Sequence, residues 1–412
     1  MNEVHSPSVP LREAAERNTP ALVRFLQSLV SIPSESAQER AVVLRAAEEM
    51  RSLGFHEVKI DGFGNVLGRV GTGPVVIAMD GHLDTVGVGD RSTWRRDPYG
   101  AAVEDGVLYG RGASDQEGGF AAAVYGAAIA KELGLLDGVQ LWVTGTVLEE
   151  DCDGLCWQYI LREKVLQPEV VVITEPTDLG VYRGHRGRME IEVRTQGRSA
   201  HGSAPERGDN AVSKMAAVIA DIERHNAALA ETADPFLGKG SVTISEIRST
   251  SPSLCAVADS CTIHLDRRLT RGETAESAVR AIEALPGVRA AGATVTVLEY
   301  ARAGYTGLVY PTRKVYPTWV LEADEPAVVA AVAAATLALG APPRVDKWTF
   351  STNGVATRGM FGVPTVGFGP ANEVHAHTPD DQCPVEHLTR AAAVYAAFPR
   401  AYLAARLPKG PA

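Results

Sequence analysis

The sequence has no run of basic residues, and its formal net charge is −10 over 412 residues. Nucleic acids and anionic membranes are bound by clustered positive charge, so we expect neither kind of partner. No apolar stretch is long enough to span a bilayer. The polar N-terminus, residues 1–18, lacks the apolar segment of a signal peptide. These absences predict a cytoplasmic protein.

Cysteine is also scarce. The five cysteines are odd in number, and their spacing does not indicate a disulfide framework. Cys152 and Cys156 lie four residues apart, but no second cysteine or histidine cluster completes a structural zinc site. We therefore expect them to be buried thiols. The hydrophobic share of 45% and the charged share of 22% are typical of a globular protein with a substantial core.

Short apolar runs alternate with helical stretches along most of the chain. The runs are residues 75–79, 139–146, 170–174 and 365–368, and the helical stretches include 21–30, 37–53, 118–133, 325–339 and 386–407. This alternation predicts an α/β fold, in which a mostly parallel sheet is covered by helices on both faces.

Residues 188–302 show a different order of strand-like and helical segments. Strand-like segments at 189–195, 241–247, 260–265 and 293–300 alternate with helical ones at 210–225 and 272–285. The order β-α-β-β-α-β is that of a ferredoxin-like α+β domain. We therefore predict an inserted domain at 188–302, between two parts of the larger domain at 1–187 and 303–412.

Acidic and histidine side chains follow three of the apolar runs, namely His82, Asp84, Glu149, Glu150 and Glu175. Ligands of open α/β sheets bind at the carboxyl ends of the strands, so we expect these side chains to gather there. Two more candidates are Asp115, in a glycine-rich bend before a helix, and His377, near the C-terminus.

Carboxylates crowded in this way repel one another unless cations neutralise them. Two divalent ions would do so, because carboxylates and imidazoles are suitable zinc ligands and a two-metal site can share a bridging carboxylate. One acid should remain free to accept a proton from water, which accounts for the adjacent pair Glu149 and Glu150. His375 competes with His377 for the last ligand position.

Four segments together carry a resemblance to a known family: Gly81–Val86, Gly110–Asp115, Glu149–Glu150 and Ala376–Asp380. The chain resembles the co-catalytic zinc aminoacylase and carboxypeptidase family, which includes acetylornithine deacetylase, succinyl-diaminopimelate desuccinylase, aminoacylase and glutamate carboxypeptidase. The resemblance runs through nearly the whole chain. It implies a zinc-exopeptidase-like catalytic domain and an inserted lid and dimerisation domain, hence a homodimer.

The resemblance also implies roles for these residues. His82 and Glu175 would bind one metal, Glu150 and His377 the other, and Asp115 would bridge them. Asp84 would orient the imidazole of His82, and Glu149 would be the general base. The peptide bond after Asp115 would be cis. Zinc is the metal implied, although cobalt and manganese suit the same ligands.

In the inserted domain, His201 resembles the histidine that stabilises the oxyanion, usually at the partner subunit's site. Arg268, or alternatively Arg267, resembles the arginine that holds the substrate carboxylate. Asn353 and Gly354 resemble a substrate-side loop, although many relatives carry an acidic residue at the position of Asn353. The segment 347–353 looks closest to a bacterial subgroup described as selenium-metabolism-linked hydrolases.

These features predict a hydrolase that cleaves the amide bond of an N-acyl amino acid or a related small substrate with a carboxylate. A dipeptidase or carboxypeptidase would use the same residues and is the alternative. A non-catalytic metal-binding or peptide-binding protein is a remote one, because Glu149 and every ligand position are filled.

Overall fold

The computed structural model describes residues 8–407. Residues 1–7, part of the N-terminus in which no signal peptide is predicted, lie outside the described residues. None of the helices within 8–407 combines the length and the apolar character that crossing a membrane requires. As predicted, Cys152 and Cys156 are free buried thiols.

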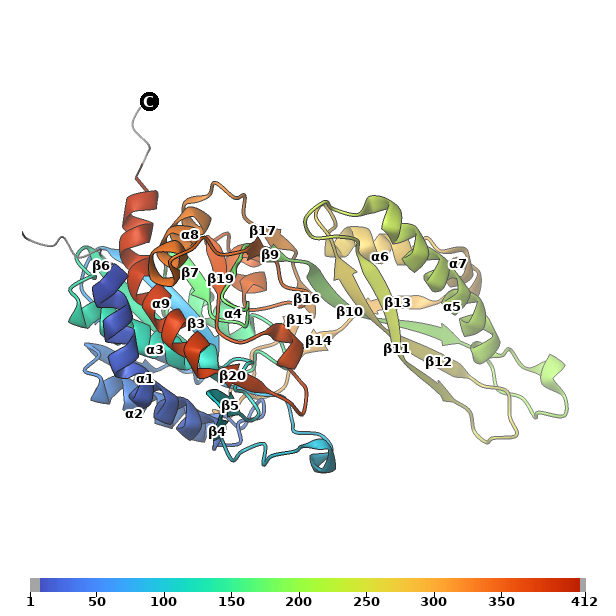
Figure 1. Cartoon of the computed structure of the whole chain (residues 1–412). Coiled ribbons are helices and arrows are strands. Elements are labelled where there is room, and N and C mark those ends of the chain that lie inside the picture. Colours follow the sequence, from blue (N-terminus) through green and yellow to red (C-terminus); the bar gives the residue numbers. More distant parts are fainter. Residues whose placement is uncertain (1–7, 408–412) are drawn as a thin grey trace, which may run out of the picture.

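The larger part of the molecule is built on an eight-stranded sheet (Figure 1). Its strands, in order across the sheet, are β1 (Glu57–Ile60), β2 (Val66–Gly71), β6 (Val139–Thr146), β3 (Val75–His82), β7 (Val170–Ile173), β19 (Thr365–Phe368), β8 (Val181–Tyr182) and β18 (Val345–Asp346). The four central strands, β6, β3, β7 and β19, are parallel, and antiparallel strands flank them. Their continuous apolar runs are buried because both faces of the sheet are covered.

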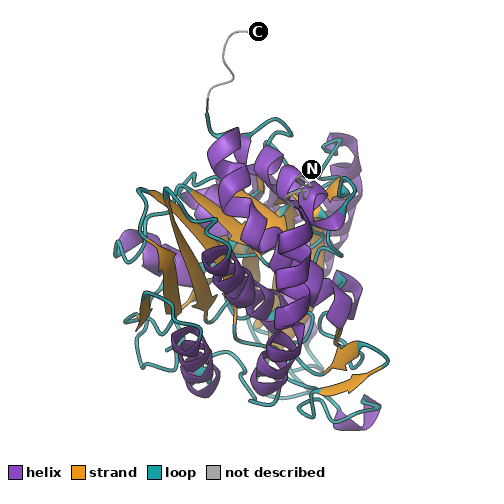
Figure 2. Cartoon of the chain, turned by 60° about the vertical axis from the view of Figure 1, so that its left-hand side comes forward, coloured by secondary structure: helices purple, strands orange, loops and turns teal. Residues whose placement is uncertain are grey.

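Helices pack along this sheet (Figure 2). They are α1 (Ser8–Val30), α2 (Arg40–Ser52), α3 (Glu117–Glu132), α4 (Leu155–Arg162), α8 (Pro326–Leu339) and α9 (Val385–Ala405). Adjacent residues of β3 point to opposite faces. Gly81 faces Phe120 of α3, and Asp80 faces the other way, towards Asn353. The helix α1 begins well before the predicted residue 21, because Leu11, Ala14 and Ala15 are also buried in the core.

A second sheet has the order β11-β12-β10-β13, with every neighbouring pair antiparallel. Its elements are β10 (Gly187–Gln196), α5 (Ala211–Ala228), β11 (Ser241–Thr250), β12 (Ser260–Leu269), α6 (Ala275–Glu283), α7 (Pro286–Ala291) and β13 (Thr294–Val297). This is the ferredoxin-like arrangement, and it has its own apolar core. A further strand, β16 (Val315–Tyr316), pairs with β10 although it follows residue 302.

Shorter elements complete the described chain. They are η1 (Arg91–Thr93), β4 (Ala102–Glu104), β5 (Val107–Tyr109), β9 (Gly184–His185), η2 (Pro205–Arg207), η3 (Leu229–Thr232), β14 (Glu299–Tyr300), β15 (Thr312–Arg313), β17 (Trp319–Val320), η4 (Val355–Met360), η5 (Glu373–His375) and β20 (Gln382–Pro384).

Candidate active site

Three neighbouring strands end at the same edge of the larger sheet. His82 ends β3 and is in register with Thr146, the last residue of β6. Asp80 is in register with Ile173, the last residue of β7. The segments that follow β6 and β7 carry the predicted acids, and Asp115 approaches from the bend before α3, with a cis peptide bond to Gln116. Parallel pairing therefore brings distant segments to one place.

His82 lies at the centre of the buried acids. Its Nε2 atom is 3.0 Å from Asp115 Oδ1, 3.6 Å from Glu175 Oε1 and 3.8 Å from Glu149 Oε2. Its Nδ1 atom is 2.7 Å from the backbone oxygen of Asp84, which orients the ring.

The carboxylate of Asp84 lies beside His82 and also contacts the segment of the paired glutamates. It accepts hydrogen bonds from the backbone N–H groups of Glu149 and Glu150, at 3.1 and 3.0 Å, and from Ser36 Oγ at 2.7 Å. Its nearer oxygen is 3.7 Å from His82 Nδ1. Asp84 thus orients His82 through its main chain and holds the paired glutamates through its side chain.

His377 faces the other oxygen of Asp115. Its Nε2 atom is 3.3 Å from Asp115 Oδ2 and 3.0 Å from Glu150 Oε2. Hydrogen bonds to these two carboxylates raise the pKa of His377 to about 10. The alternative, His375, instead contacts Gln382. Asp115 therefore lies between two histidines, which is the placement that the bridging role requires.

Burial dominates the electrostatics of the acids. It raises the pKa of Glu149 and of Glu175 well above the ordinary value, and the negative charges nearby, Asp153 beside Glu149 and Asp115 beside Glu175, raise it further. Burial and the charge of Asp115 raise the pKa of Glu150 to about 7. For Asp115, burial acts in the same direction, but hydrogen bonds from His377 and His82 outweigh it and hold its pKa below the usual range.

This donor set fits divalent metal ions. His82, Asp115 and Glu150 form one group whose ligand atoms lie close enough to share an ion, and His82, Glu149 and Glu175 form another. Glu149 Oε1 and Glu175 Oε2 are buried and have no hydrogen-bond partner among the described residues. Buried, unpaired carboxylate oxygens beside imidazole nitrogens are the ligands that zinc and similar ions accept.

A cavity of about 340 Å³ opens over these acids. The candidate site residues that line it are Asp115, Glu149, Glu150, Glu175 and His377. The other residues of its wall are Asp153, Arg188, Arg268, Phe350, Ser351, Glu373 and Ala376. Arg268 is held by Asp266, whereas Arg267 is buried against Glu273. The structure thus places Arg268 in the cavity. Arg188 and Glu373 were missed because only the folded chain brings them to the site.

Asn353 and Gly354 are not on the cavity wall, which corrects the predicted substrate contact. Asn353 is 1% exposed and directs its amide at groups inside the protein. A Cβ atom at Gly354 would lie 2.5 Å from the ring of Trp319. Glycine is needed there for packing.

His201 is exposed on the inserted domain and does not line this cavity. Its Nδ1 atom accepts hydrogen bonds from the backbone N–H and the hydroxyl of Ser203. Any contact of His201 with an active site must therefore come from a second chain or from a movement of the domain.

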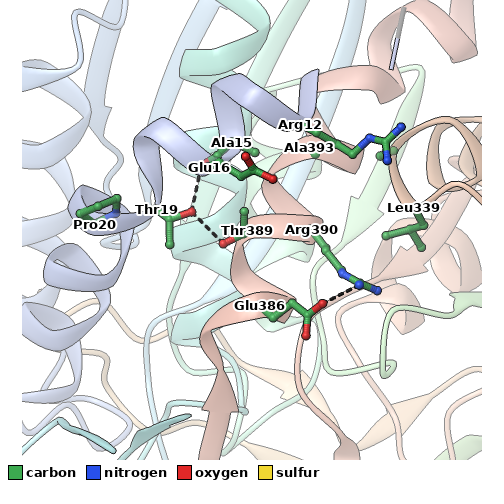
Figure 3. A pocket seen from close by; sticks show the side chains of 11 residues that line it. Arg12, Ala15, Glu16, Thr19, Pro20, Leu339, Glu386, Thr389, Arg390 and Ala393 are labelled. Carbon is green, nitrogen blue, oxygen red and sulfur yellow. Dashed lines mark hydrogen bonds and ion pairs between the residues drawn. The ribbon is translucent and has the colours of Figure 1, made fainter. Parts of the chain in front are cut away.

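A larger cavity, of about 600 Å³, opens between α1, α8 and α9 (Figure 3). Two hydrogen-bonded threonines, Thr19 and Thr389, lie side by side in it, and Glu386 pairs with Arg390. The residues that line it include neither histidine nor cysteine. The candidate catalytic groups line the smaller cavity instead.

The comparison with protein families agrees with this geometry. Residues 78–401 match the family described as Peptidase family M20/M25/M40. The chain belongs to this family. As a member of peptidase family M20/M25/M40, it is a hydrolase, and its predicted membership of the aminoacylase and carboxypeptidase group is confirmed.

Individual relatives agree with the family and the fold. The chain is 54% identical to the uncharacterized protein YgeY of Escherichia coli, over 93% of this chain and 94% of that protein. It is 32% identical to an acetylornithine deacetylase of Pectobacterium carotovorum, over 50% of this chain and 56% of that protein. The crystal structure of a Staphylococcus aureus tripeptidase has the same fold, with a TM-score of 0.73 and 21% identity over 95% of this chain and 99% of the tripeptidase.

Proposed function

We propose that this hydrolase uses two metal ions to cleave the amide bond of N-acyl amino acids, or of related small substrates with a carboxylate. The observation that carries the proposal is the position of Asp115 between His82 and His377, with the buried Glu149 beside them. One cavity thus combines metal-ligating groups with an acid that can move a proton.

Under this proposal, His82 and Glu175 would hold one ion, Glu150 and His377 would hold the other, and Asp115 would serve both. When bound, the two ions supply acidification of a water molecule and stabilisation of negative charge on the substrate oxygen. We propose zinc, and cobalt or manganese would fit the same oxygen and nitrogen ligands.

Glu149 acts as the general base. Its Oε1 atom has no partner among the described residues, and burial keeps its affinity for a proton high. It would take a proton from the attacking water on this oxygen and return it to the leaving nitrogen. The backbone N–H of Glu149 donates a hydrogen bond to the Asp84 carboxylate, which holds the main chain of Glu149 in place.

Arg268 positions the substrate by its carboxylate. A guanidinium group grips a carboxylate through two parallel hydrogen bonds, and Asp266 orients the side chain. We propose a homodimer formed through the inserted domain, in which His201 of one chain reaches the active site of the other and stabilises the oxyanion.

A dipeptidase is the second candidate, and Glu373 favours it. This residue lines the cavity with one oxygen, Oε2, buried and without a hydrogen-bond partner among the described residues, while Thr349 holds the other. A free carboxylate of this kind suits the ammonium group of a dipeptide, which N-acyl amino acids lack. The name of the tripeptidase with the same fold supports this alternative, and that of the deacetylase supports the first.

A substrate panel separates the two. Initial rates on acetyl amino acids should exceed those on dipeptides with the same C-terminal residue. The reverse order, together with loss of the dipeptide preference in Glu373→Gln, would establish the dipeptidase.

A further inference from the structure

A second buried carboxylate lies directly behind the active site. Asp80 is fully buried in β3, two residues before His82. Its Oδ1 atom accepts hydrogen bonds from Thr144 Oγ1 at 2.7 Å and from Thr146 Oγ1 at 3.1 Å. Its Oδ2 atom accepts one from Asn353 Nδ2 at 2.8 Å. Three side-chain donors thus satisfy this buried carboxylate inside the protein.

Asn353 uses both ends of its amide. Its Nδ2 atom also lies 3.2 Å from Thr146 Oγ1, while its Oδ1 atom accepts hydrogen bonds from Gly154 N at 2.9 Å and from Cys156 Sγ at 3.1 Å. It therefore joins three segments: the strand that ends at His82, the strand that leads to Glu149 and Glu150, and the loop that follows those glutamates.

The same residue anchors one wall of the cavity. Phe350 and Ser351 line the cavity just before Asn353 in the chain. Ser351 donates a hydrogen bond to Asp153, which also lines the cavity. A shift of Asn353 would thus move the substrate wall relative to the candidate metal ligands.

We infer that Asp80 and Asn353 are a positioning pair, in which the hydrogen bond between them holds the loop that carries Phe350 and Ser351 against β3. This role rests on the proposed function, because it fixes the substrate wall against the catalytic strands. Neither residue lines the cavity, so neither is a catalytic residue.

Exchanging the two side chains is chemically reasonable. A carboxylate at position 353 would still accept the hydrogen bonds from Gly154 and Cys156, because both are donors. An amide at position 80 would still accept one from Thr144 and would donate across the pair. In the single variants, the donors and acceptors of the two side chains no longer match. Asn353→Asp brings two carboxyl groups together in a buried site, and Asp80→Asn sets an amide against the amide of Asn353, with fewer acceptor positions for the surrounding donors.

The test measures KM, kcat, metal content and thermal unfolding for Asp80→Asn, Asn353→Asp and the double variant D80N/N353D. Thr144→Val is the control, since it removes one hydrogen bond to Asp80 and leaves the hydrogen bond between Asp80 and Asn353 in place. We expect Asp80→Asn to raise KM roughly tenfold with its metal content unchanged, and Asn353→Asp to lose activity or fold poorly. The double variant should recover most of the loss in both kcat/KM and the unfolding midpoint.

A double variant that is no better than the worse single one would overturn the pair. If the wild-type chain hydrolyses nothing in the panel, the proposed function fails, and the unfolding midpoints alone decide the pair. Recovery of the midpoint in the double variant would then support the pair, and additive changes in the midpoint would reject it.

Discussion

Asp115 directs Oδ1 at Nε2 of His82 across 3.0 Å, although 33 residues separate the two in the chain. The other oxygen of Asp115 remains available to a second ligand set. We therefore expect Asp115→Asn to impair the binding of both ions, since an amide supplies only one anchoring oxygen and no charge. The loss of affinity should exceed the roughly 10–100-fold typical of an outer hydrogen-bond partner.

Metal content after dialysis measures this effect. The matched control is Asp90→Asn, which removes an exposed carboxylate that does not line the cavity. An Asp115→Asn variant that keeps both ions would exclude the bridge.

Glu149→Gln separates proton transfer from metal binding. The amide cannot take up the proton, so kcat should fall by about 10²–10⁴-fold. Metal content should stay at the wild-type level, because other residues hold the ions. Turnover close to that of the wild type would remove Glu149 from the mechanism.

Arg268→Ala tests recognition of the carboxylate. Loss of a charged hydrogen-bond donor, about 1.5–3 kcal/mol, should raise KM roughly 10–100-fold and change kcat less. Arg267→Ala is the comparison, because that side chain is buried against Glu273. It should lower stability and leave KM almost unchanged. An unchanged KM in Arg268→Ala would place the substrate carboxylate elsewhere.

A buried histidine outside the candidate ligand set, His185, should make the stability of the folded chain sensitive to acid. Its Nε2 atom accepts hydrogen bonds from Trp319 Nε1 at 2.7 Å and from Thr352 N at 3.1 Å. Burial lowers its pKa from 6.5 to about 4, and the nearby charge of Arg268 acts in the same direction. The stability that neutral His185 contributes is fully present above pH 6.5 and is lost as the pH falls towards 4.

Between pH 7 and pH 5 this loss should be about 2 kcal/mol of unfolding free energy. Denaturant unfolding of the wild type and of His185→Gln measures it, since titration of the other groups cancels in the difference. The wild type should lose more stability than the variant. Equal losses would show that His185 is not held neutral.

The candidate site was predictable from the sequence where it follows strand ends. His82, Glu149 and Glu175 come just after apolar runs, and the carboxyl ends of parallel strands converge on one edge. The sequence pattern alone therefore predicted that these three side chains lie close together. Asp115 and His377 were found through the glycine-rich bend and the His-Thr-Pro-Asp segment, which depend on the family resemblance.

The positions of other residues depend on tertiary contacts that no local pattern encodes. Asn353 meets Asp80, 273 residues away, so this side chain, which was expected to contact substrate, points into the core, while Ser351 of the same loop lines the cavity. Arg188 reaches the cavity because Asp153 and Glu190 orient it from two sides. Directions of side chains on loops follow from packing, which becomes visible only in the folded chain.

Removal and restoration of metal tests the central claim most directly. The purified protein would be assayed for metal content and for hydrolysis of the acyl amino acid and dipeptide panel, before chelation, after it, and after return of zinc, cobalt or manganese. We expect close to two ions per chain, with activity lost on chelation and restored by metal. A chain that binds no metal, and whose activity does not respond to any of the three, would contradict the account.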